Sequence, residues 1–236
     1  MPDHTVTAYN DELRALDHHI AKMGGHCELM LGRSFDALEK RDPAIAHEVI
    51  ELDSEVDELQ RVVEEQAVII IAKRQPMAND LRQIMASLRV ANELERIGDL
   101  SKNIAKRAAV IADQSYPRQL VSGLRHMVEL TLEQLNKVLD AYAARDADAA
   151  VRVWRNDAQI DSTYNSVFRE LLTYMMEDPR NISHCTHLLF GAKNVERIGD
   201  HATNIAENVV FLVRGTQLKD ERPKNDTTSS TIIGHS

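Results

Sequence analysis

One eleven-residue segment occurs twice in the chain, and this duplication constrains the fold more than any other feature of the sequence. Residues 95–105 read ERIGDLSKNIA, and residues 196–206 read ERIGDHATNIA. Eight of the eleven positions are identical, and the copies lie 101 residues apart. Helical propensity alone does not produce such identity, so the sequence predicts a tandem repeat of two similar halves.

Both copies lie within helical patterns, because apolar residues recur around them at alternating spacings of three and four. In a helix, Glu95, Asp99 and Asn103 fall at i, i+4 and i+8 and form one stripe beside the apolar seam. Glu196, Asp200 and Asn204 repeat the arrangement in the second copy. Like charges at i and i+4 repel, so their repetition indicates a cation that offsets the repulsion.

Gly98 and Gly199 occupy matched positions inside these two helices. Glycine costs about 1 kcal/mol relative to alanine in a helix interior. Its repeated use predicts a close approach at this point, either by another helix or by an occupied site beside the carboxylates.

Composition indicates an all-α protein, because aromatic residues make up only 4% and the chain has 6 prolines. The net charge of -9 argues against nonspecific nucleic-acid binding and is compatible with cation binding. The longest apolar run covers only residues 67–72, so we expect a soluble, intracellular protein without a membrane span. Cys27 and Cys185 are isolated and are expected to be buried packing residues.

The predicted fold is six long antiparallel helices, arranged as two up-down-up three-helix bundles related by the internal repeat. We expect the first bundle over 1–112, the second over 117–215, and a disordered tail over 216–236. Asp42 and Asp178, each followed by proline, read as helix caps.

A second acidic set lies on the preceding helix of each half. Asp53 and Asp57 are spaced i and i+4 on the second helix, and Asp157 and Asp161 match them at an offset of 104. That offset also relates the Arg41-Asp42 turn to Arg145-Asp146. Facing acid pairs on adjacent helices supply the oxygen ligands that a hard cation or iron requires, which predicts a metal-binding surface in each half.

Several alternatives remain open from the residues alone. The acids can be a solvated face of a purely structural spacer, or they can serve a metal-dependent enzyme or a metal store. His201 is an extra ligand candidate in one half only and reads more simply as a surface histidine. Arg96 and Arg197 read more simply as ion-pair partners of acids on a neighbouring helix than as phosphate ligands. No Glu-x-x-His pattern occurs, which disfavours a redox di-iron enzyme, and no residue is nominated as catalytic.

The duplicated E-R-I-G-D-x-x-x-N-I-A segment, the two D-x-x-x-D pairs and the two-times-three-helix plan resemble the PhoU family of phosphate-specific transport system accessory proteins. The resemblance covers residues 8–215. It implies a cytoplasmic, non-enzymatic, usually homodimeric negative regulator of the phosphate-starvation response. It also implies two partners, the ATPase subunit of the phosphate ABC transporter and a membrane sensor histidine kinase, so that membrane contact is indirect.

The resemblance further implies bound metal ions, with Fe, Zn, Mn or Mg as the candidates. Carried over by position, the ligand candidates are Asp53, Asp57, Glu95, Asp99, Asn103, Asp157, Asp161, Glu196, Asp200, Asn204 and Glu207. The position that matches Glu207 in the first half is Lys106. We therefore expect the two sites to be occupied unequally.

Overall fold

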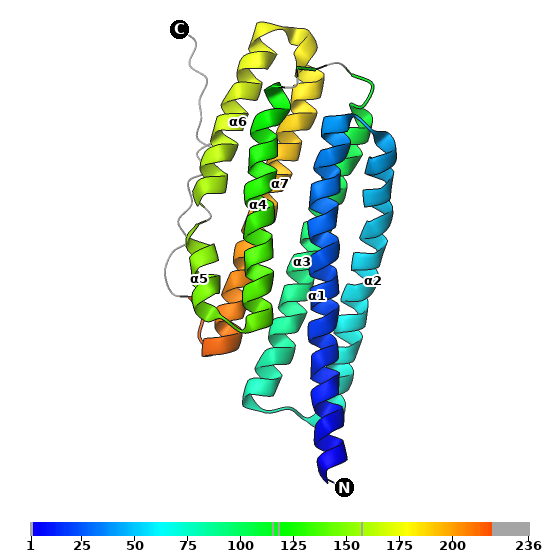
Figure 1. The fold of residues 1–236 in the computed structure, drawn as a ribbon, viewed down its shortest axis with the longest axis vertical. Coiled ribbons are helices and arrows are strands. Elements are labelled where there is room, and N and C mark those ends of the chain that lie inside the picture. The colour runs from blue at the N-terminus through cyan, green and yellow to red at the C-terminus, as the bar shows by residue number, and fades with distance from the viewer. Residues whose placement is uncertain (1, 115, 118, 157, 219–236) are drawn as a thin grey trace.

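The structure is a computed structural model that describes residues 2–114, 116–117, 119–156 and 158–218. Its elements are helical, and the described residues contain no strand, so the predicted all-α fold is confirmed. Figure 1 shows the helices running side by side along the long axis of the molecule. None of the described helices combines the length and apolarity needed to cross a lipid bilayer.

The first three helices are α1 (Pro2–Lys40), α2 (Pro43–Arg74) and α3 (Ala78–Val110). The expected start of α2 is confirmed, because the Asp42 side chain accepts a hydrogen bond from the Ala44 backbone N–H and Pro43 is the first helical residue. The core follows the predicted rhythm along α1, where Leu16 and Ile20 are fully buried. These helices therefore end and pack where capping and apolar periodicity direct them.

The remaining helices are α4 (Gln119–Ala144), α5 (Ala147–Arg155), α6 (Ala158–Glu177), the short 3-10 helix η1 (Pro179–Asn181) and α7 (Ile182–Arg214). The region expected as one fifth helix is divided at Asn156, which forms a turn between α5 and α6. Asp146 caps α5 as Asp42 caps α2. Asp178 caps η1, which leads directly into α7.

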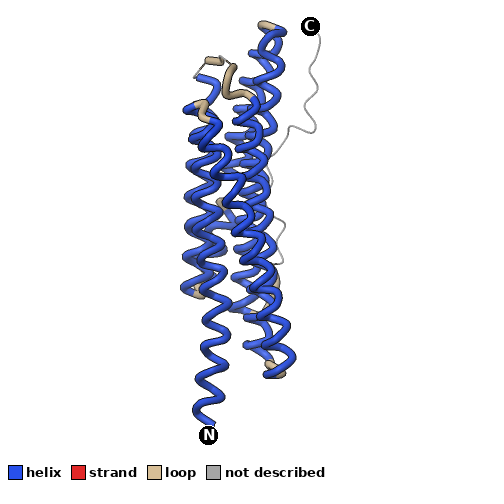
Figure 2. Tube along the Cα trace, turned by 90° about the vertical axis from the view of Figure 1, so that its right-hand side faces the viewer, coloured by secondary structure: helices blue, strands red, loops and turns tan. Residues whose placement is uncertain are grey.

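The two motif helices occupy the centre of the molecule. α3 packs against α1 and α2 and also against α7, while α4 contacts α1 and α7. The outer flanks are formed by α2 on one side and by α5 and α6 on the other (Figure 1). Seen from the side, the helices run roughly parallel, and the N-terminal end of α1 projects beyond its neighbours (Figure 2).

A glycine in α1 lies against the side chain of Leu139 where the two halves meet. A Cβ atom added to Gly24 would lie 2.8 Å from Leu139 Cδ1 of α4, a distance that real Cβ contacts do not show. The absence of a side chain at this position therefore leaves room for Leu139 in its present rotamer.

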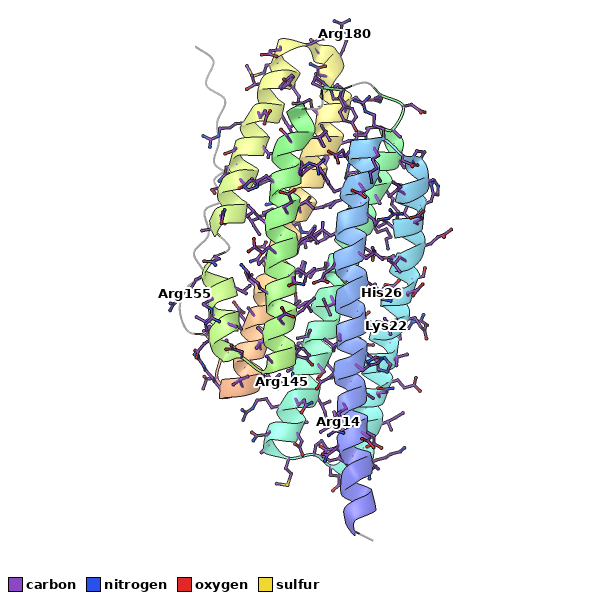
Figure 3. The ribbon with its side chains drawn as sticks, viewed as in Figure 1. Arg14, Lys22, His26, Arg145, Arg155 and Arg180 are labelled. Atoms are coloured by element: carbon purple, nitrogen blue, oxygen red, sulfur yellow. The ribbon has the colours of Figure 1, made fainter. Side chains whose placement is uncertain are left out.

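A buried polar network ties the halves together at one end of this interface. The Tyr142 hydroxyl donates to Asp17 Oδ1 at 3.0 Å and lies 2.9 Å from Ser87 Oγ. Arg145 Nη2 donates to both Asp17 carboxylate oxygens at 2.7 Å, and Gln83 Nε2 donates to Oδ2 at 3.2 Å. Arg145 lies at the lower end of α4 in Figure 3. The network joins α1, α3, α4 and the α4–α5 turn.

A similar arginine–tyrosine pair closes the opposite end. The Arg41 guanidinium lies 4.4 Å from the Tyr116 ring centroid and donates to the Tyr116 carbonyl oxygen at 2.6 Å. The Tyr116 hydroxyl donates to the Leu38 carbonyl oxygen, and its ring stacks on His184. Both Arg-Asp turns found in the sequence thus fasten one half to the other.

The expected tail falls mostly outside the described residues, which end at Leu218. Leu218 itself packs partly buried against the core. Disorder over 219–236 stays a prediction.

We expect Tyr142→Phe to lower the free energy of unfolding by about 1 to 2 kcal/mol, because the loss of the hydroxyl leaves Asp17 and Ser87 short of a buried hydrogen-bond partner. Urea denaturation at pH 7.5 measures this loss. A change below about 0.3 kcal/mol would contradict a stabilising role for the network.

The same substitution should alter the alkaline limb of the stability curve. Burial, assisted by the Asp17 charge, raises the pKa of Tyr142 to about 12. Between pH 10 and 12 the unfolded chain ionises this phenol while the folded chain does not, so stability falls as the pH rises. Phenylalanine cannot ionise, and the variant should therefore show a shallower decline over this window.

Candidate functional site

The first acidic cluster lies between α2 and α3, as the sequence predicts. Asp53 on α2 is buried, with 5% of its surface exposed, and Glu95 and Asp99 face it from α3. The charges of Asp57 and Asp99 act on Asp53, and those of Asp53, Asp57 and Asp99 act on Glu95. The four carboxylates therefore form one electrostatic unit.

A lysine sits inside this cluster. Lys102 Nζ donates to Asp53 Oδ2 at 2.5 Å and to Asp99 Oδ1 at 2.7 Å, so its ammonium bridges α2 and α3. The spacing of the acids alone does not identify Lys102 as a member of the cluster. The sequence nevertheless marks position 102 as one of the three at which the motif copies differ, because Thr203 occupies it in the second copy.

The pKa shifts show how strongly the cluster is strained electrostatically. Burial raises the pKa of Asp53 despite the hydrogen bond and charge of Lys102, which lower it. Burial also raises the pKa of Glu95, and the neighbouring acids add to the effect. Burial lowers the pKa of Lys102, yet its hydrogen bonds to Asp53 and Asp99 outweigh this and the pKa is raised overall. Burial thus disfavours the charged form of both carboxylates, and the contacts with Asp53 and Asp99 favour the charged form of Lys102.

Arg96 belongs to the same unit, and its ion-pair partners lie on its own helix α3 and not on the neighbouring helix that was expected. Its Nε lies 3.4 Å from Glu95 Oε2, and its Nη1 lies 3.8 Å from Asp99 Oδ2. The side chain is half-exposed, so these pairs add little stability and mainly orient the acids.

Gly98 lies where α2 comes closest to α3. A Cβ atom added there would meet Val56 Cγ1 at 3.4 Å and Asp53 Oδ1 at 3.7 Å. These are ordinary van der Waals distances. The predicted close approach is therefore that of α2, and it leaves room for a methyl group.

The acids of the second half lie on α6 and α7, two helices that pack against each other, and they are called the second acidic cluster here. Asp161 on α6 and Glu196 on α7 are buried, and Asp200 is half-buried one turn further along α7. Asp157, the fourth expected member, lies outside the described residues. Lys193 Nζ pairs with Glu196 Oε2 at 2.9 Å, and its ammonium lies 5.0 Å from the Tyr164 ring centroid.

The asparagines of the motif do not join the acidic clusters in the arrangement expected. Asn204 Nδ2 donates to Glu93 Oε2 of α3 at 3.0 Å, and His201 Nδ1 lies 2.7 Å from the same oxygen. Asn103 is exposed on α3. Asn204 and His201 thus serve the contact between the two bundles, which the repeat pattern alone does not reveal.

Glu207 also has a different partner. Its Oε1 accepts a hydrogen bond from the indole N–H of the buried Trp154 on α5 at 3.0 Å. Seven residues separate it from Asp200, which corresponds to roughly 10 Å along a helix. The matched residue of the first half, Lys106, is exposed.

The donor chemistry of the two clusters suits a hard cation, because every member is a carboxylate. In the first half, however, the ammonium of Lys102 lies at hydrogen-bond distance from the oxygens that a metal would take. Among the residues that the structure describes, no three Asp, Glu, His or Cys side chains are close enough to hold a metal ion as they stand.

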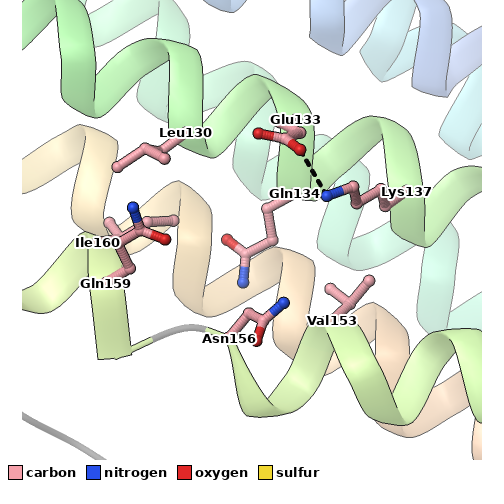
Figure 4. A pocket seen from close by; sticks show the side chains of 8 residues that line it. All are labelled: Leu130, Glu133, Gln134, Lys137, Val153, Asn156, Gln159 and Ile160. Atoms are coloured by element: carbon pink, nitrogen blue, oxygen red, sulfur yellow. Dashed lines mark hydrogen bonds and ion pairs between the residues drawn. The ribbon is translucent and has the colours of Figure 1, made fainter.

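A separate small pocket of about 100 Å³ opens where α5 gives way to α6 (Figure 4). Amide side chains of Gln134, Asn156 and Gln159 line it, and Lys137 pairs with Glu133 at its edge. The pocket accompanies the break in the fifth helix and is distinct from the carboxylate clusters.

Comparison with known proteins places both halves in one family model. The model described as the PhoU domain matches residues 20–108 and again residues 124–209. Each matched segment contains one copy of the motif and the helix that faces it. The predicted duplication is thereby confirmed.

Whole-length relatives agree. A protein of Rhizobium meliloti named phosphate-specific transport system accessory protein PhoU homolog is 53% identical over 227 residues, which cover 96% of each chain. A Caulobacter vibrioides protein of the same name is 46% identical over 97% of this chain and 100% of its own. The crystal structure of PhoU from Pseudomonas aeruginosa superposes with a TM-score of 0.85 at 39% identity, covering 88% of this chain and 100% of that one. That of Streptococcus pneumoniae gives 0.82 at 26% identity, covering 89% and 99%.

We expect Gly98→Ala to stabilise the protein by about 0.5 to 1 kcal/mol, because alanine gains helix propensity and its methyl group fits against Val56. Gly98→Val should instead destabilise it by about 1 to 3 kcal/mol, since the larger side chain overpacks the α2–α3 contact. Thermal and urea denaturation measure both. A destabilised alanine variant would show that Gly98 is needed for more than the close approach of α2.

Proposed function

The chain belongs to the PhoU family, and we propose that it is a regulatory accessory protein of a phosphate-specific transport system. The observation that carries this proposal is the match to proteins of that name through both halves and both motif copies. Those relatives are named as accessory proteins and not as enzymes, which supports action through binding.

In the finer form of the proposal, the protein is a cytoplasmic negative regulator of the phosphate-starvation response. It acts as a homodimer and links the ATPase subunit of the phosphate ABC transporter to a sensor histidine kinase. Support for these steps comes from the family resemblance of the duplicated motif. The polar networks at both ends of the bundle interface add support, since they hold the halves as one rigid surface for partners.

The proposal also includes a divalent or iron-type cation at the second acidic cluster. Asp161, Glu196 and Asp200 would hold it, with Asp157 as a further candidate outside the described residues. Asp161 and Glu196 are buried carboxylates on packed helices, and carboxylate oxygens are the ligands that hard cations prefer, which supports this assignment. The alternative is a metal-dependent enzyme or metal store, and metal-dependent turnover that is lost in Asp200→Asn would favour it.

In cells, we expect deletion of the gene to release alkaline phosphatase expression in phosphate-rich medium, because the regulator no longer restrains kinase output. A plasmid copy of the wild-type gene should restore repression, and the empty plasmid should not. Unchanged expression in the deletion strain would contradict the regulatory role.

In vitro, we expect Mn²⁺, Zn²⁺ or Mg²⁺ to stabilise tag-free wild-type protein, by about 2.7 kcal/mol at a free metal concentration one hundred times Kd. Asp200→Asn should lose most of this gain while remaining helical by circular dichroism. Asp113→Asn, at an exposed acid beyond α3, is the matched control and should retain it. If Asp200→Asn instead becomes slightly more stable regardless of metal, the acids only repel one another on a solvated face.

A further inference from the structure

The two acidic clusters differ in how their charge is balanced. In the first half, Lys102 contributes its ammonium to both walls of the cluster, Asp53 on α2 and Asp99 on α3. The repeat places Thr203 at the matched position of the second half. The two halves thus share the same motif helix, one with a lysine at this position and one with a threonine.

The lysine is held in place by burial as well as by charge. Its side chain is 19% exposed, and that of Asp53 is 7% exposed. If the ammonium moved out to solvent, the Asp53 carboxylate would remain buried without a counter-charge, which is strongly unfavourable. Lys193 in the second half is twice as exposed, at 38%, and pairs with Glu196 of its own helix. Its ammonium also lies 5.0 Å from the Tyr164 ring centroid on α6.

A divalent ion cannot share the first cluster with this ammonium. Hard cations take carboxylate oxygens at about 2.0 to 2.6 Å, while Lys102 Nζ is already 2.5 Å and 2.7 Å from one oxygen of each aspartate. A metal ion that used these two oxygens would compete with Lys102 for them, and one held by the remaining carboxylate oxygens would be repelled by the ammonium at close range in a partly buried site.

We propose that Lys102 is a built-in cation that takes the place of a metal ion in the N-terminal half, so that this half is held together without metal. The comparison with the second half rests on the proposed function, in which the second acidic cluster binds a cation. It assigns to Lys102 the role of deciding which of the two duplicated clusters responds to divalent cations.

The test replaces the lysine with its counterpart from the other half. Lys102→Thr and wild-type protein, full-length and tag-free, are stripped with chelator and titrated with Mn²⁺. Bound Mn²⁺ per chain is counted by equilibrium dialysis with electron paramagnetic resonance, and Tm is recorded with and without Mn²⁺. Lys106→Thr removes the same charge from an exposed position on the same helix and serves as the matched control.

We expect Lys102→Thr to bind one more Mn²⁺ ion per chain than wild type, and its Tm to rise several degrees more on adding Mn²⁺. Lys106→Thr should behave as wild type. A folded Lys102→Thr that binds no additional ion would overturn the inference, whatever the wild type binds. If the wild type binds no Mn²⁺ but Lys102→Thr binds one, the inference stands and the metal part of the proposed function fails.

Asp99→Asn in the wild-type background keeps the test decisive if Lys102→Thr does not fold. Asp99 is the more exposed of the two bridged acids, so the fold should tolerate the change. Because Lys102 and not a metal occupies this cluster, the amount of bound Mn²⁺ should stay the same. Loss of an ion from this variant would show that the first half binds metal in the presence of Lys102, and the inference would be wrong.

Discussion

The structure depends on the packing of α3 against α7. Each of these helices is also covered by other helices of its own half, so little of its circumference is left for solvent. Small residues of the motif, such as Gly98 and Ala105, are buried where neighbouring helices approach. The motif's charged residues are thereby confined to the edges of this central pair, and that confinement creates the two carboxylate clusters.

Much of the fold follows from local rules that the sequence displays. Apolar periodicity marks the seams, and the aspartates at 42 and 146 begin helices because their side chains satisfy otherwise free backbone N–H groups. The break at Asn156 was not foreseen, because the periodic pattern continues across it. The contact of His201 and Asn204 with Glu93 was not foreseen either, because a repeat specifies each half and not how the halves pack.

The candidate site was predictable as a set of residues but not as an arrangement. Residue spacing places the carboxylates on one face of a helix. It does not show that the long side chain of Lys102 on α3 reaches Asp53 on α2. Glu207 illustrates the same limit: its partner Trp154 has no counterpart in the first half, where the position matching at the 104 offset is Ile50. Glu207 and Trp154 in the second half are thus both replaced in the first half, by Lys106 and Ile50. The change from Glu207 to Lys106 therefore accompanies the loss of a hydrogen-bond partner and is not by itself evidence of unequal metal sites.

Divergence between the halves has a physical consequence that a symmetric protein would lack. An ammonium that belongs to the chain neutralises a carboxylate cluster at every cation concentration, since it is never diluted away. In the second half, Lys193 pairs with Glu196 of its own helix, and Thr203 stands at the position that matches Lys102. α3 and α7 pack directly on each other, and Lys102 already bridges α2 and α3 in the first half. A cation that drew α6 and α7 closer together would therefore shift α7 relative to a first half that does not change. Tyr142 and Arg145 join the two halves at one end, and Arg41 and Tyr116 join them at the other. If a cation binds in the second half as proposed, these contacts would transmit the resulting change in charge to the rest of the molecule.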